Sequence, residues 1–149
     1  MKYILLSLLA LNLFAYAENS ADCYASATKQ FELNSCAINE EKIANTELEN
    51  TYNLLLSLYK DDPVFIDRLK ESQANWLKYK ESQITMKYPH SAEPRYYGSV
   101  FPMCNHSYSA RITSARILEL KEWLNGTEEG EVCSGSQKNE SSLKEVPKK

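Results

Sequence analysis

Residues 44–80 read ANTELENTYNLLLSLYKDDPVFIDRLKESQANWLKYK, and this stretch indicates the fold class. In its first half, apolar side chains recur every three or four residues, which is the spacing of one face of a helix. Asp61-Asp62-Pro63 then interrupts the pattern, because aspartate is a good N-cap and proline is favoured in the first helical turn. A second periodic segment follows. Two long helices joined by so short a connection run antiparallel. The first apolar stripe is Ala44, Leu48, Tyr52, Leu55 and Tyr59.

The same periodicity continues in both directions from this stretch. The second stripe is Ile66, Leu69, Gln73, Trp76, Lys80 and Ile84, and a third is Thr113, Ile117, Leu120 and Leu124. Tyr88-Pro89 and Asn125-Gly126 are typical helix ends, since the residue before proline avoids the helical conformation and glycine is favoured just after a helix. We therefore predict an all-α fold, an antiparallel bundle of three main helices with a long loop before the third. The expected helices cover 43–59, 64–87 and 109–124, with a short helical turn over 28–34 and the loop over 88–107.

The first residues predict export. Lys2 precedes an apolar run from residue 4 to 14, and Ala15-Tyr16-Ala17 has the small residues of a signal peptidase site. The apolar run is too short to span a bilayer, so we expect no membrane insertion after cleavage. We predict a signal peptide over 1–17, a helical domain over 18–126 and a disordered polar tail over 127–149. The mature protein would be periplasmic or extracellular.

Composition and motifs restrict the function classes. The formal net charge of −3 argues against nucleic acid as a partner and favours a basic one. Ten tyrosines are compatible with an interaction surface. The sequence contains no Gly-x-Ser-x-Gly elbow and no His-Glu-x-x-His zinc motif, so we predict a protein that is not an enzyme. Cys104-Asn105-His106 has no nearby residues to complete a four-ligand zinc site, and we expect no metal and no cofactor.

Three segments resemble a known family. They are Cys23 with TKQFELNSCA at 28–37, then the stretch from 48 to 52 with QANWLKYK at 73–80, and finally Gly98-Ser99 with Thr113-Ser114-Ala115-Arg116 and Leu120. In this order and spacing they are similar to the LprI-type lysozyme inhibitors. The resemblance implies a small secreted helical domain that binds and inhibits a lysozyme-type muramidase. The alternative is an exported interaction or envelope-stress module with an unrelated protein partner.

The resemblance has two departures. Ile84 and Tyr108 stand where family members often carry a pair of cysteines, and an apolar contact between them is expected to replace that bridge. Four cysteines in an exported domain suggest two disulfides, with three connectivities. We predict that Cys23 pairs with Cys36 and that Cys104 pairs with Cys133. The first pairing requires the chain to fold back before residue 28, because thirteen residues of a single helix would separate the sulfurs by about 20 Å.

Five residues of the family-like segments are expected to have structural roles. They are Gln73, Trp76, Tyr79, Thr113 and Arg116. Trp76 is expected in the core, with Gln73 satisfied by a buried hydrogen bond. Arg116 lies beside Thr113 on the inward side of its helix, and a buried guanidinium must be paired. We predict that its partner is a carboxylate of the first long helix such as Glu47.

The long loop supplies the candidate binding residues. These are Arg95, Tyr96, Tyr97, Ser99 and Phe101, since loops on rigid scaffolds carry binding residues and aromatic anchors with an arginine are frequent hot spots. The expected partner is a protein, a basic lysozyme in the first hypothesis. In the other interpretation of the loop, Tyr96, Tyr97 and Phe101 cap the open end of the bundle.

Overall fold

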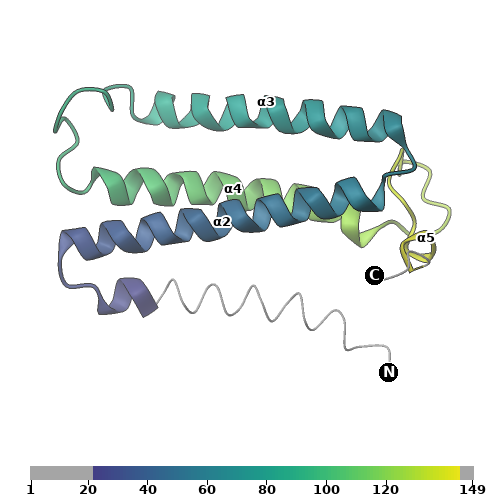
Figure 1. Cartoon of the computed structure of the whole chain (residues 1–149), viewed down its shortest axis with the longest axis horizontal. Helices are drawn as coiled ribbons and strands as arrows, with labels where there is room; N and C mark the ends of the chain where they lie inside the picture. The colour runs from purple at the N-terminus through teal and green to yellow at the C-terminus, as the bar shows by residue number, and fades with distance from the viewer. Residues whose placement is uncertain (1–21, 145–149) are drawn as a thin grey trace.

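The protein is a bundle of three long antiparallel helices (Figure 1). The computed structural model describes residues 22–144, so the predicted signal peptide at 1–17 lies outside the described residues. The elements are a helical segment over 22–26, then α2 (Gln30–Leu58), α3 (Pro63–Lys87), α4 (Phe101–Asn125) and the short α5 (Glu140–Lys144). Within 22–144, the only β pairing is a single bridge between Thr127 and Asn139. The predicted all-α bundle is confirmed.

Two helix starts differ from the prediction. The turn expected over 28–34 and the helix expected from residue 43 are one helix, α2, which begins at Gln30. Glu32 caps this start, because its carboxylate accepts hydrogen bonds from the backbone N–H groups of Thr28 and Lys29 at 2.7 and 3.0 Å. The third helix begins at Phe101 instead of 109. Pro102 lies in its first turn, where a missing N–H has no cost, so this proline starts the helix and does not belong to the loop. The loop is therefore 88–100.

The start of α3 follows the sequence prediction closely. The side chain of Asp62 accepts a hydrogen bond from Phe65 N at 2.9 Å, and Pro63 is the first helical residue. A polar N-cap followed by proline satisfies one free backbone donor and removes another. The turn between α2 and α3 is therefore fixed by local chemistry, as predicted.

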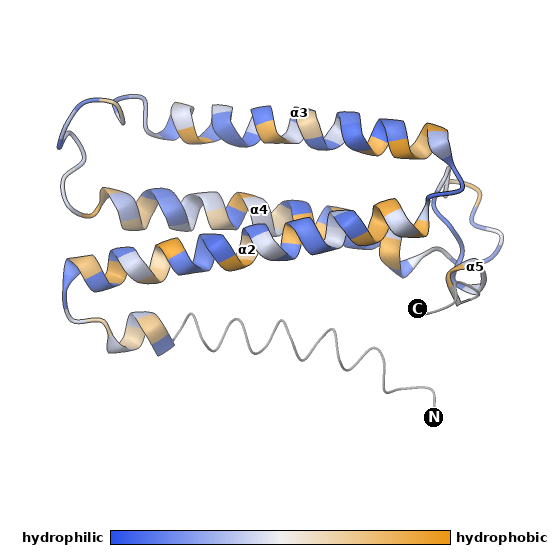
Figure 2. Ribbon diagram, in the orientation of Figure 1, coloured by the Kyte–Doolittle hydropathy of each residue, from blue (hydrophilic) through white to orange (hydrophobic). Residues whose placement is uncertain are grey.

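The apolar core lies at the end of the bundle where α2 ends and α3 begins. Figure 2 shows hydrophobic residues at this end of the helices, and others along their length. The buried cluster takes residues from all three predicted stripes, which are Leu48, Leu55, Tyr59, Leu69, Ile117 and Leu120. α4 packs closely against α2, whereas α3 has far fewer contacts with α4 and buries only Leu69 fully. α3 is thus the least embedded of the three long helices.

The segment after α4 packs against this core end. Gly126 ends α4 with a φ of 77°, and a side chain there would lie 2.9 Å from the carbonyl oxygen of Lys138. The backbone N–H of Lys138 donates to the hydroxyl of Tyr59 at 3.1 Å, and Gln137 donates to the carbonyl of Glu122 at 2.6 Å. The main-chain N–H of Lys138 and the side chain of Gln137 thus fasten this segment to the ends of α2 and α4, and the disorder expected for 127–149 stays a prediction.

The cysteines form one disulfide among the described residues. Cys23 and Cys36 are bonded, with their Cα atoms 5.8 Å apart, which confirms the first predicted pairing. Cys104 and Cys133 are both free, so the second pairing is wrong. Cys104 lies in the first turn of α4 and Cys133 lies beyond the end of that helix, about 30 Å further along at 1.5 Å per residue. A disulfide requires Cα atoms within about 7 Å.

Candidate binding site at the loop end of the bundle

The end of the bundle opposite the apolar core is formed by loop 88–100 and by the first turns of α2 and α4, and we call it the loop end (Figure 1). Its centre is Tyr88, which is buried. The rings of Tyr97, Phe101 and Tyr108 meet the Tyr88 ring edge-on, with centroid distances of 5.4, 5.3 and 6.3 Å. Edge-to-face rings at these distances attract one another beyond simple burial. This cluster closes the bundle where its apolar core does not reach.

Tyr96 lies at the edge of this cluster, with its ring edge-on to that of Tyr97 at a centroid distance of 4.8 Å. Its side chain is 55% exposed, and its ring stacks on the His90 imidazole with a centroid distance of 4.4 Å. The Tyr97 hydroxyl accepts a hydrogen bond from His90 N at 3.3 Å, and His90 Nδ1 lies 2.5 Å from a carboxylate oxygen of Glu93. The two adjacent tyrosines therefore have different surroundings. Tyr97 packs as the capping interpretation expects, while Tyr96 presents an aromatic surface to solvent.

Arg95 and Ser99 complete the predicted set. Arg95 has a φ of 63°, a backbone conformation that is uncommon for residues other than glycine. It makes no ion pair with any residue within 22–144, and it is exposed. Ser99 contributes its backbone carbonyl, which accepts a hydrogen bond from Asn34 Nδ2 at 3.1 Å. Of the five candidate residues, Arg95, Tyr96 and Ser99 are exposed, whereas Tyr97 and Phe101 are partly buried.

Asn34 of α2 holds the loop against α4, and the sequence interpretation did not single it out. Its Oδ1 accepts a hydrogen bond from Met103 N at 3.2 Å, while its Nδ2 donates to Ser99 O. The N-cap of α4 is Val100, which has no side chain able to accept from the first N–H groups. Asn34 supplies that acceptor from another helix. The signal lay in the motif ELNSCA, where a polar residue precedes a buried cysteine by two positions.

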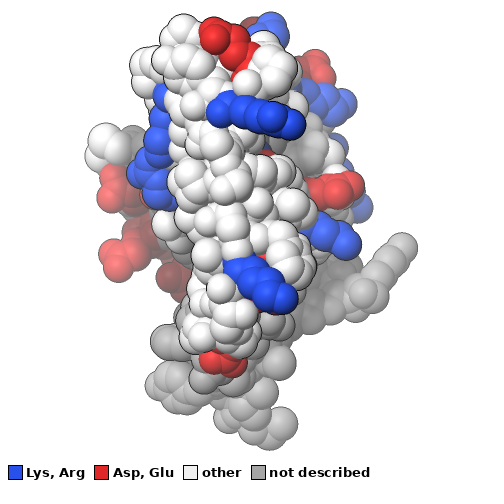
Figure 3. All heavy atoms as spheres, turned by 90° about the vertical axis from the view of Figure 1, so that its left-hand side faces the viewer, with Lys and Arg blue, Asp and Glu red and all other residues white. Residues whose placement is uncertain are grey.

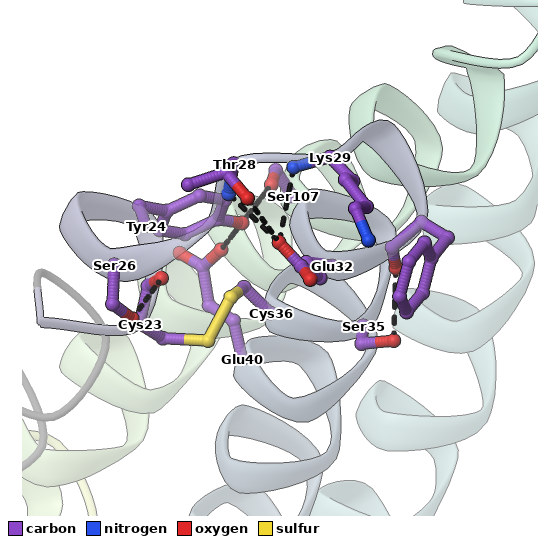
Figure 4. The surroundings of a disulfide bond; sticks show 11 residues. Cys23, Tyr24, Ser26, Thr28, Lys29, Glu32, Ser35, Cys36, Glu40 and Ser107 are labelled. Carbon is purple, nitrogen blue, oxygen red and sulfur yellow. Dashed lines mark hydrogen bonds between the residues drawn. A yellow bond between two sulfur atoms is a disulfide. The ribbon is translucent and has the colours of Figure 1, made fainter.

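The beginning of the described chain is fastened beneath the loop end (Figure 4). The disulfide joins the 22–26 segment to α2, and the hydroxyl of Tyr24 donates to Glu40 at 3.0 Å and lies 3.0 Å from the Ser107 hydroxyl on α4. Ser107 also donates to Glu40 at 3.2 Å. The 22–26 segment is therefore held to α2 by a covalent bond, and a small hydrogen-bond network joins it to Glu40 of α2 and Ser107 of α4.

Few charges interrupt the surface of this end. Figure 3 looks directly onto it and shows a largely uncharged middle, crossed by a few lysine or arginine side chains and flanked by further basic and acidic ones. Phe31, Tyr96 and Val100 are large apolar side chains that stay exposed. Exposed aromatic and aliphatic groups with few charges between them are the composition of a protein-binding surface.

The middle of the bundle contains a serine, a histidine and a glutamate close together, but their arrangement is not catalytic. His106 Nδ1 lies 2.5 Å from Glu41 Oε2, and the Ser109 hydroxyl donates to the other oxygen of the same carboxylate. A nucleophilic serine would instead donate to the histidine, and it would face a substrate. Ser109 is 2% exposed. These residues join α2 to α4. Within 22–144, no group of three or more His, Cys, Asp or Glu side chains could hold a metal ion.

The motif residues lie between α3 and α4. Arg116 Nε donates to Gln73 at 3.3 Å, and its terminal nitrogens donate to Ser72 and Glu119, each at 2.9 Å. The predicted pairing with Glu47 is wrong, because Arg116 lies on the side of α4 that faces α3. Glu47 pairs with Lys121 at 2.5 Å. Trp76 packs against the core, Thr113 is fully buried and Tyr79 is 54% exposed. The expected contact between Ile84 and Tyr108 stays a prediction.

Comparison with known proteins identifies the family. Residues 21–120, which include the loop end and the motif residues, match the family described as lysozyme inhibitor LprI. The chain belongs to the LprI family. An uncharacterized protein of Rhizobium meliloti (strain 1021) is 30% identical over 118 residues, which cover 72% of this chain and 81% of that protein. No solved structure matches the chain.

Membership in the LprI family suggests a role like that of a lysozyme inhibitor, and the family is one of inhibitors and not of enzymes. None of the helices described within 22–144 is long and apolar enough to cross a membrane.

Proposed function

We propose that this LprI-family protein is exported, binds a lysozyme-type muramidase and inhibits it by covering the sugar-binding cleft with its loop end. The observation that carries the proposal is the exposed His90–Tyr96 stack beside Arg95, on a loop fastened to two helices. Family membership supports the choice of target. Secretion to the periplasm or the exterior would place the protein where muramidases act.

The chemistry of this loop is complementary to a glycosidase cleft. Most glycosidases act with two carboxylates on either side of the scissile bond, and their clefts bind sugar rings. The Arg95 guanidinium, which has no carboxylate partner within 22–144, can pair with such a carboxylate, and an arginine pair of this kind is frequently bidentate. The Tyr96 ring can occupy the position of a sugar ring. The fixed loop keeps the entropic cost of binding low. The chain's net charge of −3 adds a weak attraction toward a basic enzyme.

We expect Tyr96→Ala to weaken inhibition of a lysozyme by at least about tenfold without lowering the melting temperature, because an exposed anchor contributes to binding and not to folding. The measurement is the inhibition constant of the mature protein in a lysozyme assay on bacterial cell walls, together with direct calorimetric binding. Tyr97→Ala is expected to lower the free energy of unfolding by about 2 kcal/mol, since that ring is half-buried between Tyr88 and Phe101.

Tyr79→Ala is the matched control, because Tyr79 is 54% exposed but belongs to α3 and not to the loop. It should leave the inhibition constant unchanged. Equal losses in the Tyr79 and Tyr96 variants would exclude the loop as the binding site. A wild-type mature protein that neither binds nor inhibits lysozymes would overturn the proposed function itself.

A further inference from the structure

A cavity of about 410 Å³ lies between α3 and α4, at the core end of the bundle and away from the loop end. Its floor is apolar and consists of Phe65, Leu69, Leu120 and Trp123. Arg68 and Arg116 stand at its edge. A cavity of this size, lined by apolar side chains on one part and by polar or charged ones on the rest, has the dimensions of a small-molecule site. It exists because α3 is the least embedded helix and leaves the seam with α4 partly unfilled.

The polar lining carries two arginines and two carboxylates, and Arg68 pairs with Glu71, so Arg116 is the cation that a ligand could meet. The Arg116 side chain is only 12% exposed, whereas Glu119, its carboxylate partner, is 62% exposed. A pair in which one member is mostly in water contributes little, so an incoming anion can compete with Glu119 for the guanidinium. The Ser72 hydroxyl, which accepts from Arg116 at 2.9 Å, offers a further hydrogen bond to such an anion. The other carboxylate at the cavity, Asp62, is occupied by the N–H of Phe65.

We propose that this cavity binds an anionic amphiphile with one aliphatic chain, a medium-chain fatty acid, with its carboxylate at Arg116 and its chain on the Trp123 floor. A volume of about 410 Å³ holds about a dozen methylene groups, since each is similar in size to a water molecule at about 30 Å³. A planar guanidinium matches a carboxylate in a bidentate pair. Ser136, from the segment after α4, also lines the cavity. This site is independent of muramidase binding at the loop end.

The two tryptophans give a direct test. Trp123 lines this cavity, and Trp76 lines a different groove, so a Trp76→Phe variant of the mature protein reports on the cavity alone. Titration with decanoate should give a saturable change in Trp123 fluorescence. Decan-1-ol, the uncharged analogue, should bind at least about tenfold more weakly, because it cannot pair with Arg116.

Arg116→Gln should remove the preference for decanoate while leaving the affinity for decan-1-ol unchanged, a result that general unfolding would not produce. A second variant, Ser72→Phe, fills the cavity from an exposed position and should abolish binding of both ligands. The proposal is overturned if decanoate gives no saturable signal or if the alcohol binds equally well. It is also overturned if the fluorescence change is seen only in a Trp123→Phe variant, where Trp76 is the tryptophan that remains.

Discussion

Replacing Glu41 by alanine is expected to lower the free energy of unfolding by about 3 kcal/mol, because it removes a carboxylate that joins all three long helices. Glu41 on α2 contacts His106 and Ser109 on α4, and its Oε1 lies 3.6 Å from Lys80 Nζ on α3. Its side chain is 21% exposed and that of Lys80 is 14% exposed. Without Glu41, the ammonium of Lys80 would stay mostly buried, with the neutral oxygens of Thr113 and Asn45 and the face of the Trp76 ring as its remaining partners.

Chemical denaturation of the variant and the wild type measures this loss. Glu49→Ala is the matched control, since Glu49 lies on the same helix but is exposed and has no partner within 22–144. We expect that control to change the free energy of unfolding by less than about 0.5 kcal/mol. If the two variants were equally stable, Glu41 would not hold the helices together.

The same carboxylate should make the protein sensitive to acid. Burial alone would raise the pKa of Glu41, but hydrogen bonds from His106 and Ser109 and the charge of Lys80 outweigh burial and lower that pKa below its ordinary value of 4.5. A carboxyl whose pKa is lowered in the folded state stabilises the protein above its unfolded pKa. That contribution is lost as the pH falls from about 4.5 through the lower folded value.

Denaturation at a series of pH values tests this dependence, with Glu41→Gln as the comparison. The glutamine variant should be less stable than the wild type at neutral pH, and the difference should shrink below pH 4.5. Other acidic groups with lowered pKa values, such as Glu32, act equally in both proteins and cancel in the difference. A difference that stayed constant down to strongly acidic pH would contradict the assignment.

The helices could be predicted from the sequence because their signals are local. The stripe from Ala44 to Tyr59, the Asp62 cap and the stop at Gly126 each depend on residues within a turn or two of one another. Pro102 was predicted to belong to the loop over 88–107, but proline is common both in loops and in the first turn of a helix. The predicted start of the third helix was therefore wrong, because proline is found in both kinds of structure.

The partners of polar residues could not be predicted, because they depend on how the helices are rotated against one another. Gln73 and Lys80 were recognised as polar members of an inward stripe, but Lys80 meets Glu41, 39 positions earlier in the chain (80 − 41). Arg116 faces α3 and not α2. Its hydrogen-bond partners are therefore Ser72, Gln73 and Glu119, and not the expected Glu47. A stripe specifies which residues point inward, and the three-dimensional packing specifies which of them meet.

The sequence predicted the loop as the candidate site, but it could not distinguish the roles of the individual loop residues. Tyr96 and Tyr97 are identical neighbours in the sequence, and a double replacement of both would combine a binding effect with a folding effect. Only the loop geometry separates them, with Tyr97 turned toward Tyr88 and Phe101 and Tyr96 stacked on His90. Asn34, which fixes that geometry from α2, is distant in sequence from the loop that it holds.

Removing the disulfide is expected to lower the free energy of unfolding by about 3 kcal/mol, the value for a closed loop of about 15 residues. Cys23→Ser is the better variant, because Cys23 is partly exposed whereas Cys36 is buried and would place a hydroxyl in the core. For a domain of this size, the loss corresponds to a fall in melting temperature of roughly 12 °C. Wild-type protein in a strong reductant should show the same fall.

Cys133→Ser provides the control, because Cys133 is exposed and free, and it should not change the melting temperature under either condition. The disulfide also positions Tyr24, whose hydroxyl bonds to Glu40 and lies beside Ser107. Release of the 22–26 segment would remove both contacts and loosen α2 and α4 around Glu40 and Ser107, beneath the loop. Hydrogen exchange of amides 95–107 should therefore accelerate in Cys23→Ser and not in Cys133→Ser. If the stability falls while this exchange does not change, the disulfide contributes to the global free energy of unfolding and does not support the loop end.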